Sequence, residues 1–145
     1  MKSIQAKTIY LILVGLTTLS ANADPYRDWS DEVMKATKGL KICSTAYWDA
    51  IGGKHEDEWK KYLPDATRTC GVMKMGFNTT MLVVRKNVNG MDDILKTYHS
   101  MVLAAFDRIV PKTGQNPLEY YVLSLETVKV VYEQHLKISA LDGGW

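Results

Sequence analysis

Residues 30–53 read SDEVMKATKGLKICSTAYWDAIGG, and this stretch decides the fold. Its apolar residues recur at steps of three and four, which is the spacing of one face of an α-helix. Asp28 or Ser30 can cap the helix start. Gly52-Gly53 can end it, because glycine tolerates the left-handed turn that stops helices. The stretch predicts a helix over Ser30–Ile51, with one apolar stripe made of Val33, Ala36, Leu40, Cys43, Tyr47 and Ala50.

A second cysteine lies on the apolar stripe of the next long segment. Residues Asp65–Lys86 repeat the helical spacing, and Cys70 stands within that repeat. Two antiparallel helices joined by the Gly52 turn would bring Cys43 and Cys70 face to face. The resulting disulfide would stabilise the fold by about 3 kcal/mol, because it restricts the unfolded chain. Two reduced thiols are the alternative, and a redox site is not expected because the sequence has no Cys-x-x-Cys.

The remaining segments also show helical spacing. Lys54–Leu63 is highly charged and predicts a short helix or turn that ends before Pro64. Asp92–Val110 predicts a third long helix. The fourth begins at Asn116-Pro117, an N-cap residue followed by proline at the first helical position. The predicted core face of this helix comprises Tyr121, Leu125, Val128, Tyr132, His135 and Ser139, flanked by Val122, Val131 and Ile138.

These segments together predict an all-α fold for residues 24–145. The expected architecture is one small four-helix (or four-to-five-helix) bundle with one disulfide, and the length suits a single domain. An α+β fold is the alternative, because residues 81–84 and 128–132 are rich in strand-forming side chains.

The N-terminus resembles a cleaved signal peptide. Lys2 and Lys7 precede an apolar run over 9–19, and Ala21-Asn22-Ala23 supplies a small-residue cleavage site. The run is about 11 residues long, whereas a membrane-spanning helix needs roughly 20. We therefore expect removal of residues 1–23 and export to the periplasm, with a retained N-terminal anchor as the alternative. The residue directly after the cleavage site is Asp24 and not cysteine, so a lipid anchor is not expected.

The charge of the exported part excludes two classes of partner. Lys2 and Lys7 are removed with residues 1–23, which hold no acidic residue. The exported part therefore has 16 basic and 16 acidic residues. A nearly neutral protein has no overall field to attract nucleic acid or acidic lipid. We therefore expect neither nucleic-acid binding nor a stable membrane anchor.

The sequence contains no recognisable catalytic or metal-binding motif. His99 and His135 lie near helical stripes, but no His-x-x-x-His, Glu-x-x-His or Cys-x-x-Cys-His occurs. We predict no catalytic residue, no metal and no cofactor. A haem- or metal-binding bundle that uses His99 or His135 is the first alternative. A small exported all-helical enzyme is the second.

Several large aromatic side chains predict a protein-binding role. Trp48, Trp59, Tyr62 and Tyr120 are the residues expected to contact a partner, since exposed Trp and Tyr often anchor protein interfaces. Trp48 and Trp59 flank Gly52-Gly53, so together they could form one apolar tip. The alternative is that these rings pack on a second face of the bundle.

Residues 43–50, CSTAYWDA, resemble a pattern found in a known family. The Cys, Ala-Tyr and Asp-Ala spacing is similar to the first helix of periplasmic immunity proteins of type VI secretion amidase effectors. This resemblance implies that the protein binds and blocks a peptidoglycan amidase, a cell-wall hydrolase, and so protects the producing cell or its kin. The sequence leaves the oligomeric state open, a homodimer included.

Overall fold

The computed structural model describes residues 25–53 and 58–141, which form helices α3 (Pro25–Ile51), α4 (Trp59–Asn87), α5 (Asp92–Arg108) and α6 (Pro117–Leu141). No strand occurs within these ranges, so the all-α prediction is confirmed and the α+β alternative is wrong. The strand-like residues 81–84 belong to α4, and 128–132 belong to α6. The proposed signal peptide, residues 1–23, lies outside the described residues.

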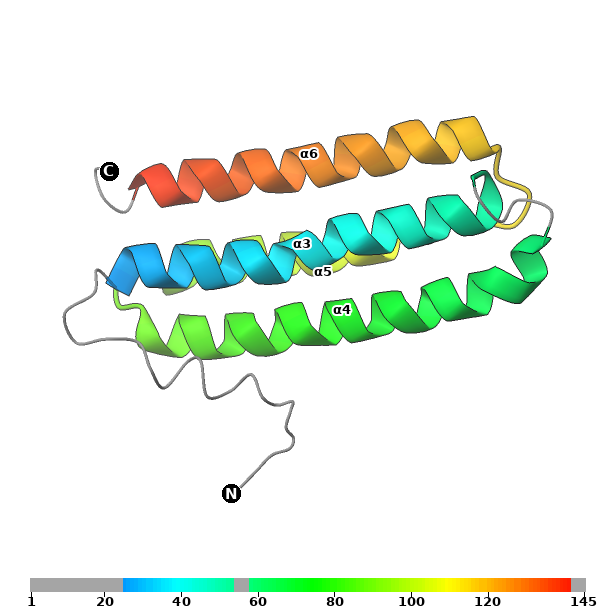
Figure 1. Ribbon diagram of the computed structural model, residues 1–145. Helices are drawn as coiled ribbons and strands as arrows, with labels where there is room; N and C mark the ends of the chain where they lie inside the picture. The colour runs from blue at the N-terminus through cyan, green and yellow to red at the C-terminus, as the bar shows by residue number, and fades with distance from the viewer. Residues whose placement is uncertain (1–24, 54–57, 142–145) are drawn as a thin grey trace, which may run out of the picture.

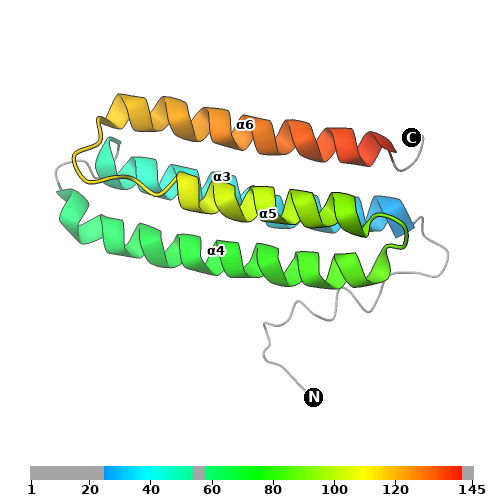
Figure 2. The same ribbon diagram turned by 180° about the vertical axis from the view of Figure 1, so that it is seen from behind.

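The four helices run alternately up and down as one bundle (Figures 1 and 2). Each helix packs against its neighbours in sequence, and α6 closes the arrangement by packing against α3. One end of the bundle gathers the end of α3, the start of α4 and the start of α6 (Figure 1). This end holds the aromatic residues that the sequence suggested for partner binding.

A disulfide links the first two helices, as predicted. Cys43 of α3 and Cys70 of α4 are bonded, and their Cα atoms lie 4.9 Å apart. Both side chains are buried, which places the cross-link inside the core. Disulfides are typical of proteins in oxidising, exported environments. Within the described ranges, no helix is long and apolar enough to cross a membrane.

The helix α4 begins earlier than the sequence predicted. Trp59 to Leu63 form its first turns, and Pro64 lies inside the helix, so the separate segment ending before Pro64 is wrong. Pro64 is exposed and close to the helix start. The loss of its one N–H donor is offset there, because Tyr62 and Leu63, the two residues before Pro64, pack against the core.

The helix α3 also starts earlier, which changes the role of Ser30. The helix begins at Pro25, a residue suited to the first helical position. Ser30 therefore lies inside the helix and is buried, so the prediction that it caps the start is wrong. Its hydroxyl instead hydrogen-bonds across the bundle to Ser139 at 2.8 Å.

The start of α6 agrees with the sequence prediction. The Asn116 side-chain oxygen accepts hydrogen bonds from the backbone N–H groups of Leu118 at 2.9 Å and Glu119 at 3.2 Å. These bonds satisfy amide donors that have no partner within the helix. Asn116 is thus an N-cap, with Pro117 at the first helical position.

The buried face of α6 differs from the predicted one. Tyr121 and Leu125 are exposed, whereas Val128, His135 and Ser139 are buried as predicted. The neighbouring Tyr120, Ser124 and Thr127 fill the core instead. Burial of the Ser124 and Thr127 hydroxyls is tolerated because each donates a hydrogen bond to a backbone carbonyl of its own helix. Leu125 belongs to a second apolar row, which lies on the outside of α6.

Candidate functional site

The residues proposed for partner binding all lie at one end of the bundle, but Tyr120 is buried there. Trp48 lies on the last turns of α3, and Trp59 lies on the first turn of α4. The start of α6 adds Tyr121 beside them. We call Trp48, Trp59, Tyr62 and Tyr121 the bundle-end patch. Its position follows from the up-down topology, which returns the chain to this end twice.

Trp48 forms the packed side of this patch. Its ring lies 5.0 Å from the ring of Tyr121, centroid to centroid, and is half-buried. Gly52 lies against the same ring: a Cβ atom there would come within 2.6 Å of Trp48 and 2.5 Å of Pro117. Gly52 is therefore required for close packing between α3 and α6. Its backbone is not in the left-handed region, so the reason given by the sequence analysis was wrong.

Trp59 forms the open side of the patch. Its side chain is 45% exposed, which makes it the most exposed tryptophan of the described residues. It lines a pocket of about 290 Å³ together with Ile51 of α3 and the loop that joins α5 to α6. The loop contributes Pro111, Lys112, Thr113, Gly114 and Gln115. An exposed ring beside a partly apolar pocket is the kind of feature that anchors protein interfaces.

Tyr62 and Tyr120 are placed differently from the other two predicted residues. Tyr62 is half-buried and packs against the core, with the Lys61 ammonium 5.2 Å from its ring centroid. Tyr120 is fully buried, and its hydroxyl donates to the Ile109 carbonyl at 2.8 Å. The prediction of Tyr120 as a partner-binding residue is therefore wrong. Burial also raises the pKa of Tyr120, so its hydroxyl remains a donor.

Sequence reasoning missed Tyr121, which it assigned to the core face. In the structure Tyr121 is 40% exposed and supports Trp48. The adjacent tyrosines differ by one helical step, so only the position of α3 and α5 decides which ring is buried. Two faces of α6 carry apolar residues at helical spacing, and one core can bury only one of these faces. This double pattern was the available signal that some predicted core residues would be exposed.

His135 lies in a buried cluster of hydroxyl groups in the half of the bundle that is away from the bundle-end patch. One ring nitrogen, Nε2, is 3.1 Å from the Ser30 hydroxyl, and Nδ1 is 3.4 Å from the Tyr98 hydroxyl. Trp29 packs edge-on against the ring. Burial lowers the pKa of His135, while the nearby Asp31 acts in the opposite direction. Burial also raises the pKa of Tyr98 to about 12, so the cluster is neutral near pH 7.

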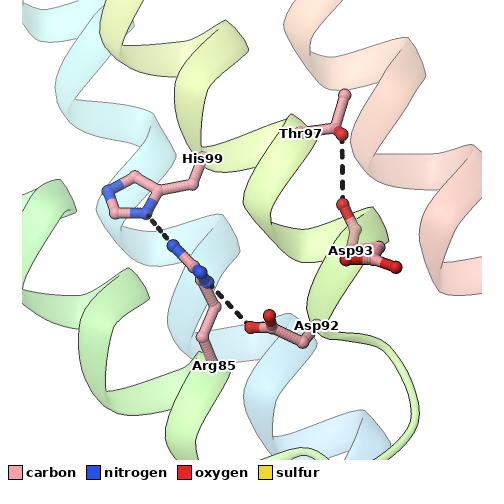
Figure 3. Close-up of polar contacts among 5 residues, drawn as sticks. All are labelled: Arg85, Asp92, Asp93, Thr97 and His99. Atoms are coloured by element: carbon pink, nitrogen blue, oxygen red, sulfur yellow. Dashed lines mark hydrogen bonds and ion pairs between the residues drawn. The ribbon is translucent and has the colours of Figure 1, made fainter.

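His99 belongs to a chain of polar contacts between α4 and α5 (Figure 3). Its Nδ1 is 3.4 Å from an Arg85 guanidinium nitrogen, which can only donate, so Nδ1 accepts. Nε2 then carries the proton and donates to the Asn78 side-chain oxygen at 2.7 Å. Arg85 also pairs with Asp92 at 3.1 Å. Burial, followed by the charge of Arg85, lowers the pKa of His99.

The two histidine clusters have the geometry of structural contacts. Asp92 reaches Arg85 rather than His99, so no carboxylate orients the imidazole as in a hydrolytic triad. A metal or haem ligand at either position would have to replace hydrogen bonds that both ring nitrogens already make. Across residues 25–53 and 58–141, no three His, Cys, Asp or Glu side chains are grouped to hold a metal ion.

The fold and the patch define a disulfide-linked four-helix bundle with an exposed aromatic end. No protein-family model, no curated protein and no solved structure matches this chain.

Proposed function

We propose that this protein is exported and binds another protein through the bundle-end patch. The observation that carries the proposal is the exposure of Trp59 beside a pocket at an end where Trp48 and Tyr121 are already packed. A large ring held in place by a rigid surround loses little conformational entropy when it is buried by a partner. Such rings contribute a disproportionate share of interface energy.

The surrounding residues favour a binding role over catalysis. The histidines are engaged in structural contacts, and Lys112 is the one charged side chain among the described residues that line the pocket. General acid–base chemistry needs a titratable group in a cleft with a suitably shifted pKa. Among the described residues that line it, the pocket beside Trp59 has no His, Asp or Glu side chain, so it suits recognition of an apolar side chain.

Export is the setting in which this proposal operates. The disulfide between Cys43 and Cys70 is consistent with an oxidising compartment, and the sequence before residue 24 has the order of a signal peptide. We place the protein in the periplasm. Export is tested by cell fractionation combined with mass spectrometry, which should find a chain that starts at Asp24.

The narrower proposal concerns the identity of the partner. The resemblance of residues 43–50 to periplasmic immunity proteins suggests a secreted peptidoglycan amidase. The protein would act by covering the active-site cleft of that enzyme, with Trp59 inserted as the central anchor. No chemical step is required of the inhibitor.

A protection experiment tests this function. Cells that export such an amidase to their own periplasm should lyse, and co-expression of this protein should restore growth. The Trp59→Ala variant should protect poorly, because it removes the anchor without disturbing the core. The matched control is Leu82→Ala on α4, an equally exposed apolar residue far along the chain from the patch. Lysis that continues despite normal amounts of the folded, exported protein would contradict the proposal.

A further inference from the structure

The outward side of α6 carries a second apolar row that its own bundle does not cover. Four of its members are strongly exposed: Leu118 by 67%, Val122 by 48%, Leu125 by 51% and Leu136 by 62%. With Lys129 and the half-buried Tyr132, the row has successive steps of four, three, four, three and four residues. This alternation is the a and d spacing by which one helix packs along another. The row therefore indicates a missing helix partner.

The row continues onto the neighbouring helix. A groove of about 780 Å³ runs over α3 and reaches Tyr132 of α6. Met34, Ile42 and Ala46 contribute its apolar part, and Ile42 is 49% exposed. Contiguous exposed apolar surface of this kind marks an interaction site on a soluble protein.

We propose that a second copy of this chain covers this face, with the two α6 helices packed antiparallel around a two-fold axis. The row is self-complementary when the axis passes at the level of residue 127. Leu118 then lies opposite Leu136 of the second copy, and Val122 lies opposite Tyr132. A two-fold axis makes each of these contacts twice.

The position of Lys129 selects the antiparallel arrangement. In a parallel pair, Lys129 would face Lys129 of the second copy within the apolar row, and the two charges would repel. In the antiparallel pair, Lys129 lies beside Leu125 and Glu126 of the second copy. The Lys129 ammonium groups and the Glu126 carboxylates of the two copies then alternate around the axis. Within one copy, Lys129 has only an exposed pair with Glu133, at 3.9 Å.

The helix α3 independently agrees with the same axis. The contacts of Trp48 with Tyr121 and of Ser30 with Ser139 show that α3 and α6 run antiparallel, and they place Ile42 level with residue 127. The proposed symmetry puts both α3 helices on the same side of the plane that contains the two α6 helices, facing each other across the axis. Ile42 would therefore meet Ile42 of the second copy.

Charges on α3 are also complementary under this symmetry. Lys35 is exposed, and it would lie at the level of Asp49 of the second copy, about two turns beyond Ile42 in each direction. The outer faces of α3 and α6 thus fit the same dimer in both apolar and charged positions. The dimer uses a different face from the Trp59 pocket, so this inference goes beyond the proposed function.

Analytical ultracentrifugation of the exported, oxidised protein tests the dimer. At micromolar concentration we expect a species of twice the chain mass. Leu136→Glu should weaken self-association roughly 100-fold, because Leu136 lies opposite Leu118 of the second copy and each dimer would bury two unpaired carboxylates. Leu82→Glu on α4, where the leucine is 54% exposed, is the matched control and should leave the dimer intact. A monomeric wild-type protein, or a dimer lost only in Leu82→Glu, would overturn the proposal.

Cross-linking tests the arrangement of the two copies. Ile42→Cys should form a covalent dimer under oxidising conditions, because the two side chains meet at the axis, whereas Leu82→Cys should not. Lys129→Glu should weaken the dimer, and addition of Glu126→Lys in the same chain should restore it. A stable dimer that Ile42→Cys fails to cross-link, or that the paired exchange fails to restore, would overturn the antiparallel arrangement.

Discussion

Gly52 shows at the scale of single residues how the absence of a side chain sets the geometry of the bundle end. The sequence indicated glycine as a helix stop, whereas the structure requires it for space beside Trp48 and Pro117. In contrast, Gly90, with φ of 81°, occupies the left-handed turn between α4 and α5 that glycine favours. Sequence alone does not separate these roles, because the crowding at Gly52 comes from a helix more than 60 residues later.

Gly52→Ala should lower the free energy of unfolding by about 1–3 kcal/mol, because the new methyl group overlaps the Trp48 ring and Pro117. Urea denaturation measures this change. Gly71→Ala is the matched control: nothing lies within 4 Å of a Cβ atom there, and alanine favours the helix. That control should gain roughly 0.5–1 kcal/mol. Equal stability of Gly52→Ala and the wild type would show that the close packing is absent.

His135 makes the stability of the bundle depend on pH. Its pKa in the folded protein lies below the ordinary value of 6.5, so the unfolded chain takes up a proton first as the pH falls. Stability should therefore be full above pH 6.5 and decrease as the pH is lowered below it. Thermal unfolding at pH 7.5 and pH 5 measures the effect.

The His135→Gln variant isolates this contribution. Glutamine can hydrogen-bond to Ser30 and Tyr98 but does not titrate, so the loss of stability on acidification should be smaller than in the wild type. His99, whose pKa is also lowered, accounts for part of the remainder. An unchanged pH dependence in His135→Gln would contradict the burial of a neutral imidazole.

Individual helices were predictable where local signals agree with packing. Asn116 and Pro117 fixed the start of α6, and the stripes of α3 and α4 placed both cysteines on facing sides. The prediction was wrong at Pro64, because core packing of Tyr62 and Leu63 outweighs the destabilisation by a proline inside the helix. It was also wrong on α6, because two apolar rows on that helix could each have been the core face. A helix with two such rows gives no single face from its sequence, because both rows satisfy the helical period.

Loss of the N-cap should weaken α6 specifically. Asn116→Ala removes the acceptor for the amides of Leu118 and Glu119, and it should cost about 1 kcal/mol of stability. Asn116→Asp keeps an acceptor and should retain most of it. Hydrogen exchange at the first turn of α6 measures the effect locally, and protection that is the same in all three proteins would refute the capping role.

The disulfide should contribute to the stability of the α3–α4 pair. Cys43→Ser should lower the free energy of unfolding by about 3 kcal/mol, because the unfolded chain regains the freedom of a 27-residue loop. Urea denaturation with and without reductant measures it. Reductant should destabilise the wild type and leave the variant unchanged. A wild type that is insensitive to reductant would mean that the cross-link adds little.

The whole molecule combines a predictable bundle with a surface that the sequence describes only in part. Trp48 and Trp59 lie at one end of the bundle because both flank the same turn. Tyr120 was misplaced and Tyr121 was missed, because the position of α6 relative to α3 depends on contacts across the whole bundle. Three features bear on separate parts of the proposed function. The disulfide bears on export, the aromatic end on partner binding, and the outer face of α6 on self-association.

The affinity of the complex with a purified peptidoglycan amidase, measured by isothermal titration calorimetry, tests the central claim most directly. The wild type should form a tight complex. Trp59→Ala should bind at least about 30-fold more weakly, as expected for an interface anchor worth 2 kcal/mol or more. Leu82→Ala should bind like the wild type. Equal affinity of Trp59→Ala and the wild type, or no binding by either protein with the disulfide intact, would contradict recognition through the bundle-end patch.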